Sequence, residues 1–216
     1  MIANFIKQSA TFVFATFFSL VMVTPVLLAA NPETRYTLVQ REAAFEIRDY
    51  PAMFTAEISM PGQRDDVLTA ASNVLSAYVQ GDNLSKKKIA TVKPVFHQLA
   101  PPLTSAIRST TKKKSEFDQN WSVSFSLLGN GPLEDFPRPG DRRINLIEMP
   151  PCRMAVLQFS GQWTDSNLDE HRDALARLLK EKGLKPVGNP IFAFYDEFWQ
   201  PFFWRHNEVM WEISLD

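Results

Sequence analysis

The chain repeats one pattern of extended runs and a helix at an offset of 101 residues. The stretch "FEIRDYPAMFTAEIS" (45–59) falls opposite "LIEMPPCRMAVLQFS" (146–160), and each is typical of two strands joined at prolines. A helix is predicted after both, because Val67, Leu68, Ala71, Val74, Leu75 and Tyr78 share one helical face and Leu168, Leu175, Leu178 and Leu179 match it in the second half. Two more extended runs complete each half, at 90–99 and 121–128 and then at 189–195 and 207–215.

Two ββαββ units favour an α+β fold. Each predicted helix has one apolar face, so the economical arrangement is a distorted eight-strand antiparallel sheet or barrel flanked by two helices. At 216 residues and 45% hydrophobic composition the chain can fill one good core, and we expect a single domain over residues 31–216. The polar stretch 101–120 is typical of an insertion loop.

The first 30 residues are typical of a secretory signal. No charge lies between Lys7 and Glu33, and an apolar run ends in "LAAN", which predicts cleavage near Ala30. The run is close to the roughly 18-residue lower limit for a membrane-spanning helix, so an uncleaved anchor stays open. We therefore expect an exported, periplasmic protein, with membrane tethering as the alternative. Cys152 is the only cysteine, so no internal disulfide is expected.

Charge and motifs exclude several functions. Without Lys7 the chain has 22 basic and 24 acidic residues, 22 − 24 = −2, which gives no bulk attraction to nucleic acid. The sequence has no glycine-rich phosphate loop, no GxSxG or HExxH motif and no paired cysteines. We therefore predict a binding protein and not an enzyme.

Histidine is the strongest metal-ligating residue type left, and it occurs three times. His97 alternates with Val95 and Leu99, so it is either a core histidine or a metal ligand. His206 alternates with Glu208 and Glu212 on the polar side of the last predicted strand, beside an aromatic cluster, and is the second candidate ligand. His171 is expected to pack on the second helix.

The aromatic cluster lies in "YDEFWQPFFWRH" (195–206), which holds six large rings between Tyr195 and Trp204. An ordinary core spreads its rings over several elements. The rings therefore either cover a ligand or close one end of the sheet, and both hypotheses stay open here.

The motifs "FEIRDYP", "DNLSKKKIATVKPV", "WSVSFSL", "FPRPGDRRI", "RMAVLQFSGQW" and "WRHNEV" occur in this order between about Tyr36 and Ser214. In this order and spacing the chain resembles the SOUL haem-binding protein family. The resemblance implies an eight-strand barrel with two helices and an internal pseudo-twofold, and reversible binding of haem or another tetrapyrrole. One family member uses a histidine at the position of Asp49, so iron ligation at that position is not expected in this chain.

The resemblance also implies a cleft between the first helix and the loop before the last strand. The candidate cofactor-binding residues are Arg64, Val67, Leu68, Ala71, Phe198, Trp199, Phe202, Phe203, Trp204 and Arg205. The rings would cover the tetrapyrrole, and the two arginines would pair with its carboxylates. We expect a carrier or buffer of haem. The alternative is a module of the same fold that binds another amphipathic ligand, or a protein partner, without haem.

Overall fold

The computed structural model describes residues 36–99, 119–129, 131–196 and 200–215. In chain order its elements are β1 (Thr37–Glu42), β2 (Phe45–Tyr50), β3 (Met53–Pro61), α1 (Arg64–Val79), β4 (Thr91–Leu99), β5 (Asn120–Leu127), η2 (Leu133–Asp135), β6 (Asn145–Met149), β7 (Cys152–Phe159), α2 (Asp165–Glu181), β8 (Pro186–Phe194), η3 (Phe202–Trp204) and β9 (Asn207–Ile213). The predicted leader and most of the loop 101–120 lie outside the described residues.

One antiparallel sheet joins the two halves by exchanging strands between them. Its order is β1-β2-β7-β9-β8-β4-β5-β3-β6. Setting β1 aside, this order reads the same from either end when each strand is replaced by its counterpart in the other half. β2 pairs with β7 of the second half, and β6 of the second half pairs with β3 of the first. Neither half therefore has a sheet of its own.

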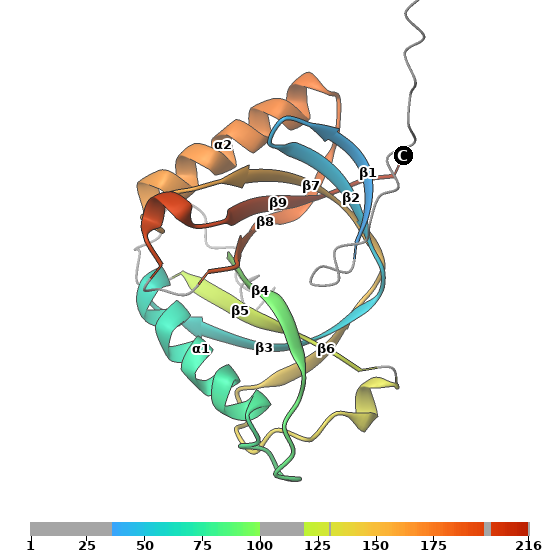
Figure 1. Cartoon of the computed structure of the whole chain (residues 1–216), viewed down its shortest axis with the longest axis vertical. Coiled ribbons are helices and arrows are strands. Elements are labelled where there is room, and N and C mark those ends of the chain that lie inside the picture. Colours follow the sequence, from blue (N-terminus) through green and yellow to red (C-terminus); the bar gives the residue numbers. More distant parts are fainter. Residues whose placement is uncertain (1–35, 100–118, 130, 197–199, 216) are drawn as a thin grey trace, which may run out of the picture.

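The strand count and the closure differ from the sequence prediction. The described residues form nine strands and not eight, because Thr37–Glu42 pairs with β2 as an additional edge strand. β1 and β6 each have one strand neighbour in this sheet, so it curves without closing and the predicted barrel is not formed by the described residues. Figure 1 shows the curved sheet with its two free edges.

Both helices lie on the outer side of the curved sheet (Figure 1). α1 packs on β3 and β5 through the buried residues Val67, Ala71, Leu75 and Tyr78, and α2 packs on β7, β8 and β9 through Leu168, Leu175 and Leu179. These contacts give one apolar core under each helix. The helical periodicity predicted from the sequence is confirmed in both halves.

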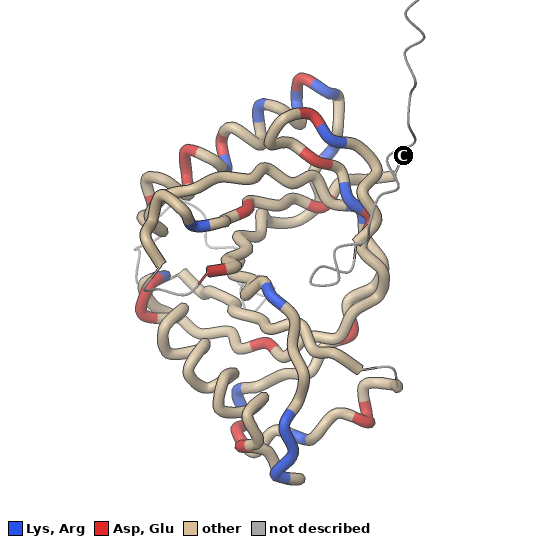
Figure 2. The backbone as a smooth tube through the Cα atoms, in the orientation of Figure 1, with Lys and Arg blue, Asp and Glu red and all other residues tan. Residues whose placement is uncertain are grey.

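Charged residues lie mainly outside these cores. Lys and Arg alternate with Asp and Glu along α2 (Figure 2). The basic run Lys86–Lys88 lies in the connection between α1 and β4, at the bottom of the view. In the described part of the chain, no helix is both long enough and apolar enough to cross a membrane.

Candidate functional site

A cleft opens on the helix side of the sheet, where the N-termini of α1 and α2 face each other. Its cavity has a volume of about 420 Å³. The lining combines apolar side chains with charged ones: Arg64, Leu99, Gln119, Trp121, Asp165, Leu168, Asp169, Arg172, Asn189, Pro190 and Phe192. This size is in the range of small-ligand sites. We call it the helix-end cleft.

Arg64 ties the two helix ends together across the helix-end cleft. Its Nε donates to Asp165 Oδ1 at 2.6 Å, and its Nη2 lies 2.8 Å from Asp65 Oδ1 and donates to the carbonyl of Trp163. Arg64 and Asp165 occupy equivalent positions of the repeat, 101 residues apart. The remaining guanidinium nitrogen, Nη1, is buried without a hydrogen-bond partner. A buried donor left unpaired is uncommon, which makes Nη1 a candidate group for a ligand anion.

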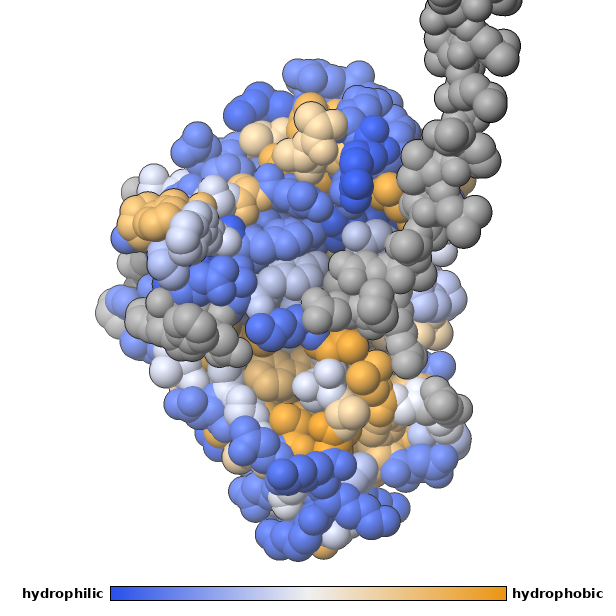
Figure 3. Space-filling model, viewed as in Figure 1, coloured by the Kyte–Doolittle hydropathy of each residue, from blue (hydrophilic) through white to orange (hydrophobic). Residues whose placement is uncertain are grey.

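Three aromatic side chains of η3 are exposed beside this cleft. Phe202, Phe203 and Trp204 are 47%, 57% and 72% exposed, so they do not form a buried plug. Figure 3 shows a hydrophobic patch at the left of the surface, where the segment before β9 lies in Figure 1. The neighbouring candidates Phe198 and Trp199 lie outside the described residues. We call Phe202–Trp204 the aromatic turn.

Trp163 connects the aromatic turn to the helix-end cleft. The guanidinium carbon of Arg205 lies 4.7 Å from the centre of the Trp163 ring, and the Trp163 carbonyl accepts from Arg64. Gly161, two residues earlier, donates its N–H to the carbonyl of Phe202 at 3.0 Å. The structure therefore brings together Arg64, Arg205 and the aromatic turn, although Arg205 also donates to the Gln200 carbonyl.

The predicted contact residues of the first helix have a different environment. Val67 and Ala71 are buried in the core beneath α1, where they pack against the sheet. Leu68 is partly buried and contacts the cores under both helices. Val67 and Ala71 do not line the cleft, because the face of α1 that carries them packs against the sheet. Only the first turn of α1, at Arg64, borders the cavity.

His97 lies under the helix-end cleft without opening into it. Its ring stacks on Trp121, with 4.7 Å between ring centres, and neither ring nitrogen has a hydrogen-bond partner. Burial lowers the pKa of His97 to about 3, and the nearby charge of Arg64 acts in the same direction. The imidazole is therefore neutral near pH 7. It cannot meet a ligand in the cleft unless Trp121 moves.

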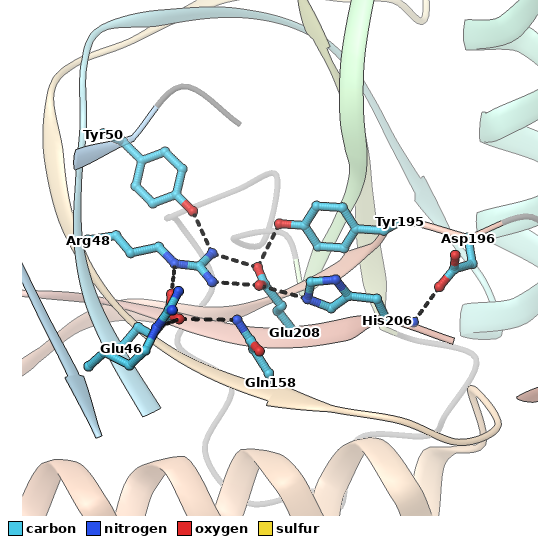
Figure 4. Close-up of polar contacts among 9 residues, drawn as sticks. Glu46, Arg48, Tyr50, Gln158, Tyr195, Asp196, His206 and Glu208 are labelled. Carbon is cyan, nitrogen blue, oxygen red and sulfur yellow. Dashed lines mark hydrogen bonds and ion pairs between the residues drawn. The ribbon is translucent and has the colours of Figure 1, made fainter. Parts of the chain in front are cut away.

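His206 lies on the other face of the sheet, within a buried network of charges (Figure 4). Its Nε2 is 3.0 Å from Glu208 Oε1, and its ring stacks on Tyr195. Arg48 donates to both oxygens of Glu208, at 2.9 and 2.7 Å, and its Nε donates to Glu46 at 2.6 Å. His206 is thus not brought together with Arg64. We call Glu46, Arg48, Tyr195, His206 and Glu208 the inner network.

The inner network keeps the carboxylate of Glu208 charged. Burial alone would raise the pKa of Glu208, but hydrogen bonds from His206, Arg48 and Tyr195 hold it at about 2. Since the pKa is lower in the folded protein than the ordinary 4.5, this contribution to stability is complete above about pH 4.5 and is lost as the pH falls toward 2.

Sequence reasoning missed the inner network. It placed Glu208 on the polar side of a strand, whereas Glu208, Glu46 and Arg48 are each only 1% exposed. The available signal was the alternation of opposite charges, Glu46 and Arg48, within a strand. Asp49, in contrast, points to the outer face and forms a two-bond ion pair with Arg153, at 2.6 and 2.8 Å. That carboxylate is already paired.

The fold defines the class of the protein: an α+β chain with one antiparallel sheet and two helices, built from two strand-exchanged halves. The family model described as SOUL heme-binding protein matches residues 31–212. The chain therefore belongs to the SOUL heme-binding protein family, and the resemblance found in the sequence is confirmed. This family is described by what it binds and not by a reaction. No curated protein matches the chain.

Solved structures with the same fold have very different sequences. The C-terminal domain of EcmrR has a TM-score of 0.59 at 9% identity, with 84% of this chain and 99% of that chain covered. An uncharacterized conserved protein from Listeria innocua has a TM-score of 0.59 at 11% identity, covering 79% and 92%. A hydrolase from the same organism reaches 0.56 at 10% identity, covering 82% and 94%. At these identities the likeness shows the fold alone.

Arg48→Met tests the inner network. The substitution leaves buried Glu208 without a guanidinium partner, while Glu46 keeps only that of Arg41, so we expect a loss of about 3–5 kcal/mol in the free energy of unfolding, measured by urea denaturation. Arg153→Met is the matched control, since it breaks the more exposed pair with Asp49 and should leave the unfolding midpoint nearly unchanged. Equal losses in the two variants would contradict the role assigned to Arg48.

His97→Phe tests the neutral buried imidazole. Because the pKa of His97 is lower in the folded protein than the ordinary 6.5, the unfolded chain binds the extra proton, and stability falls as the pH drops below about 6.5. Between pH 7 and pH 5 this amounts to about 2 kcal/mol, which His97→Phe should remove while a ring still stacks on Trp121. Parallel stability curves for the variant and the wild type would show that His97 is protonated in the folded protein as well.

Proposed function

We propose that this protein is an exported carrier or buffer of haem or a related tetrapyrrole, held by the aromatic turn beside the helix-end cleft. The observation that carries the proposal is the row of three adjacent exposed rings, Phe202, Phe203 and Trp204, which Trp163 connects to the helix-end cleft through its contacts with Arg205 and Arg64. Exposed neighbouring aromatic side chains are costly to keep in water and often mark a binding surface. Membership of the SOUL heme-binding protein family supports tetrapyrrole as the ligand class.

The residues present fit the apolar and acidic parts of haem. A tetrapyrrole is a flat apolar disc with carboxylates on one edge, so it needs rings over its face and cations at its rim. The aromatic turn supplies the rings. Arg64 supplies a guanidinium nitrogen without a partner, and Arg205 supplies a second guanidinium above Trp163. We infer that the disc lies on the aromatic turn with its carboxylates toward the cleft.

The same residues fit poorly to the iron of haem. His97 is covered by Trp121, and His206 bonds to Glu208 on the opposite face. In the described part of the chain, no three His, Cys, Asp or Glu side chains come together to hold a metal ion. We therefore infer binding through apolar contact and carboxylate pairing, without an iron bond from either histidine. Iron-centred redox chemistry belongs to haem itself, and we infer no reaction of the protein's own.

Haem titration followed in the Soret band tests this function. Wild-type protein should give a saturable shift, and the double variant Phe203→Ala with Trp204→Ala should bind about tenfold more weakly or worse, because the contact area of two rings is lost. The rings are exposed, so the unliganded variant should keep its melting temperature. Leu84→Ala, which removes a side chain that is 69% exposed elsewhere, is the control and should bind as the wild type does.

Unchanged haem affinity in the aromatic double variant would contradict the site. A complete absence of Soret shift in the wild type would contradict tetrapyrrole binding and leave the aromatic turn to another amphipathic ligand or to a protein partner.

Export is the second part of the proposal, and it rests on the uncharged run that ends in "LAAN". Intact-mass analysis of protein recovered from the exported fraction should show a chain that begins near Asn31. Full-length protein found in the membrane fraction would favour the tethered alternative, and full-length protein found only in the cytosol would contradict export.

A further inference from the structure

A second pocket lies on the inner face of the sheet, opposite both helices, and five sulfur-bearing side chains are among those that line it. Its lining includes Met53, Met149, Met154, Met210 and Cys152, the only cysteine of the chain. Of the five methionines in the described part of the chain, Met60 alone lies outside this pocket. We call it the sulfur pocket.

These side chains come from four strands and line one pocket. Met53 lies directly opposite Met149 in the pairing of β3 with β6, so the two side chains leave the sheet on the same side. Met154 on β7 and Met210 on β9 are buried in one apolar cluster, and both Met53 and Cys152 pack against that cluster. Long, flexible thioether chains therefore converge from both halves of the molecule.

Ordinary core packing is the simplest role of methionine, which fills irregular gaps. Two features here go beyond it. The four side chains line a cavity of about 80 Å³ instead of closing it. Two carboxylates, Glu57 and Glu212, also line this cavity, whereas no Lys or Arg does. The charges in the lining thus favour a cation. The rest of the lining mixes the apolar side chains of Phe96 and Ile191 with the polar ones of Tyr50, Thr55, Gln98 and Ser124.

We propose that the sulfur pocket binds a soft monovalent metal ion, Cu(I) or its analogue Ag(I), through methionine thioethers. Thioether sulfur is a soft ligand that prefers Cu(I) over hard cations such as Mg²⁺ or Ca²⁺. It carries no proton, so binding by the methionines needs no deprotonation.

This site is independent of the proposed haem surface. The sulfur pocket and the helix-end cleft share no lining residue, and they lie on opposite faces of the sheet. Figure 3 shows apolar side chains gathered in the lower centre of the inner face, beside β4. Failure of either proposal would leave the other standing.

The test measures competition for Cu(I) under anaerobic conditions between the protein and the chelator bicinchoninate. Wild-type protein should withdraw about one equivalent of Cu(I), and Ag(I), which does not change oxidation state here, should bind with the same stoichiometry in native mass spectrometry. The double variant Met53→Leu with Met154→Leu should lose about tenfold or more in affinity. Leucine has a similar volume, so the fold should persist, as circular dichroism would verify.

Met60→Leu is the matched control, because Met60 lies on β3 and packs against the core under α1. It should bind as the wild type does. No withdrawal of Cu(I) by the wild type, or an equal loss in Met60→Leu, would overturn the proposal. So would loss of binding in Cys152→Ser alone, which would show a thiolate site. X-ray absorption of the wild-type Cu(I) complex tests the proposal without any substitution. Sulfur atoms as the nearest neighbours of the metal would support the proposal, and nitrogen or oxygen atoms would overturn it.

Discussion

The guanidinium of Arg48 is buried between two carboxylates, that of Glu46 on the same strand and that of Glu208 on β9. Three buried charges are tolerable only when each keeps its partner, because an uncompensated one costs several kcal/mol. The contact spans β7, which pairs with both β2 and β9. It therefore opposes any slip in register between strands of the two halves, and the rest of the sheet depends on that register.

The register gives the two faces of the sheet different chemistry. A shift of one residue in β2 would turn Arg48 toward α2 and Ile47 away from the core under it. In the register observed, the outer face carries the helices, the helix-end cleft and Trp163, which joins Arg64 to the aromatic turn. The inner face carries the inner network and the sulfur pocket. The two proposed binding sites are separated for this reason, and neither histidine of the sequence prediction faces the aromatic turn.

Much of the fold followed from local patterns. The apolar periodicities from Val67 to Tyr78 and from Leu168 to Leu179 predicted both helices, because each helix buries one stripe of its own residues. β1 was missed since most of its residues are exposed, and an edge strand without an apolar face leaves no periodic signal. Strand exchange and the pairing of Arg48 with Glu208 were missed because both join residues far apart in the sequence, 160 positions in the case of Arg48 and Glu208. For the site, Arg64 and the rings of the aromatic turn were predicted from the sequence. The exposure of those rings could not be predicted, because it depends on which other elements of the fold pack over them.

The proposed tetrapyrrole site lies on the outer face, at the aromatic turn. Amide and indole chemical shifts of the isotope-labelled protein, followed during addition of metal-free protoporphyrin IX, test it most directly, because the porphyrin ring current moves only nearby nuclei. We expect the largest shifts at Gly161, Trp163 and Phe202–Arg205, with small changes at Met154 and Met210. Large shifts confined to the inner face, with Trp204 unmoved, would contradict it.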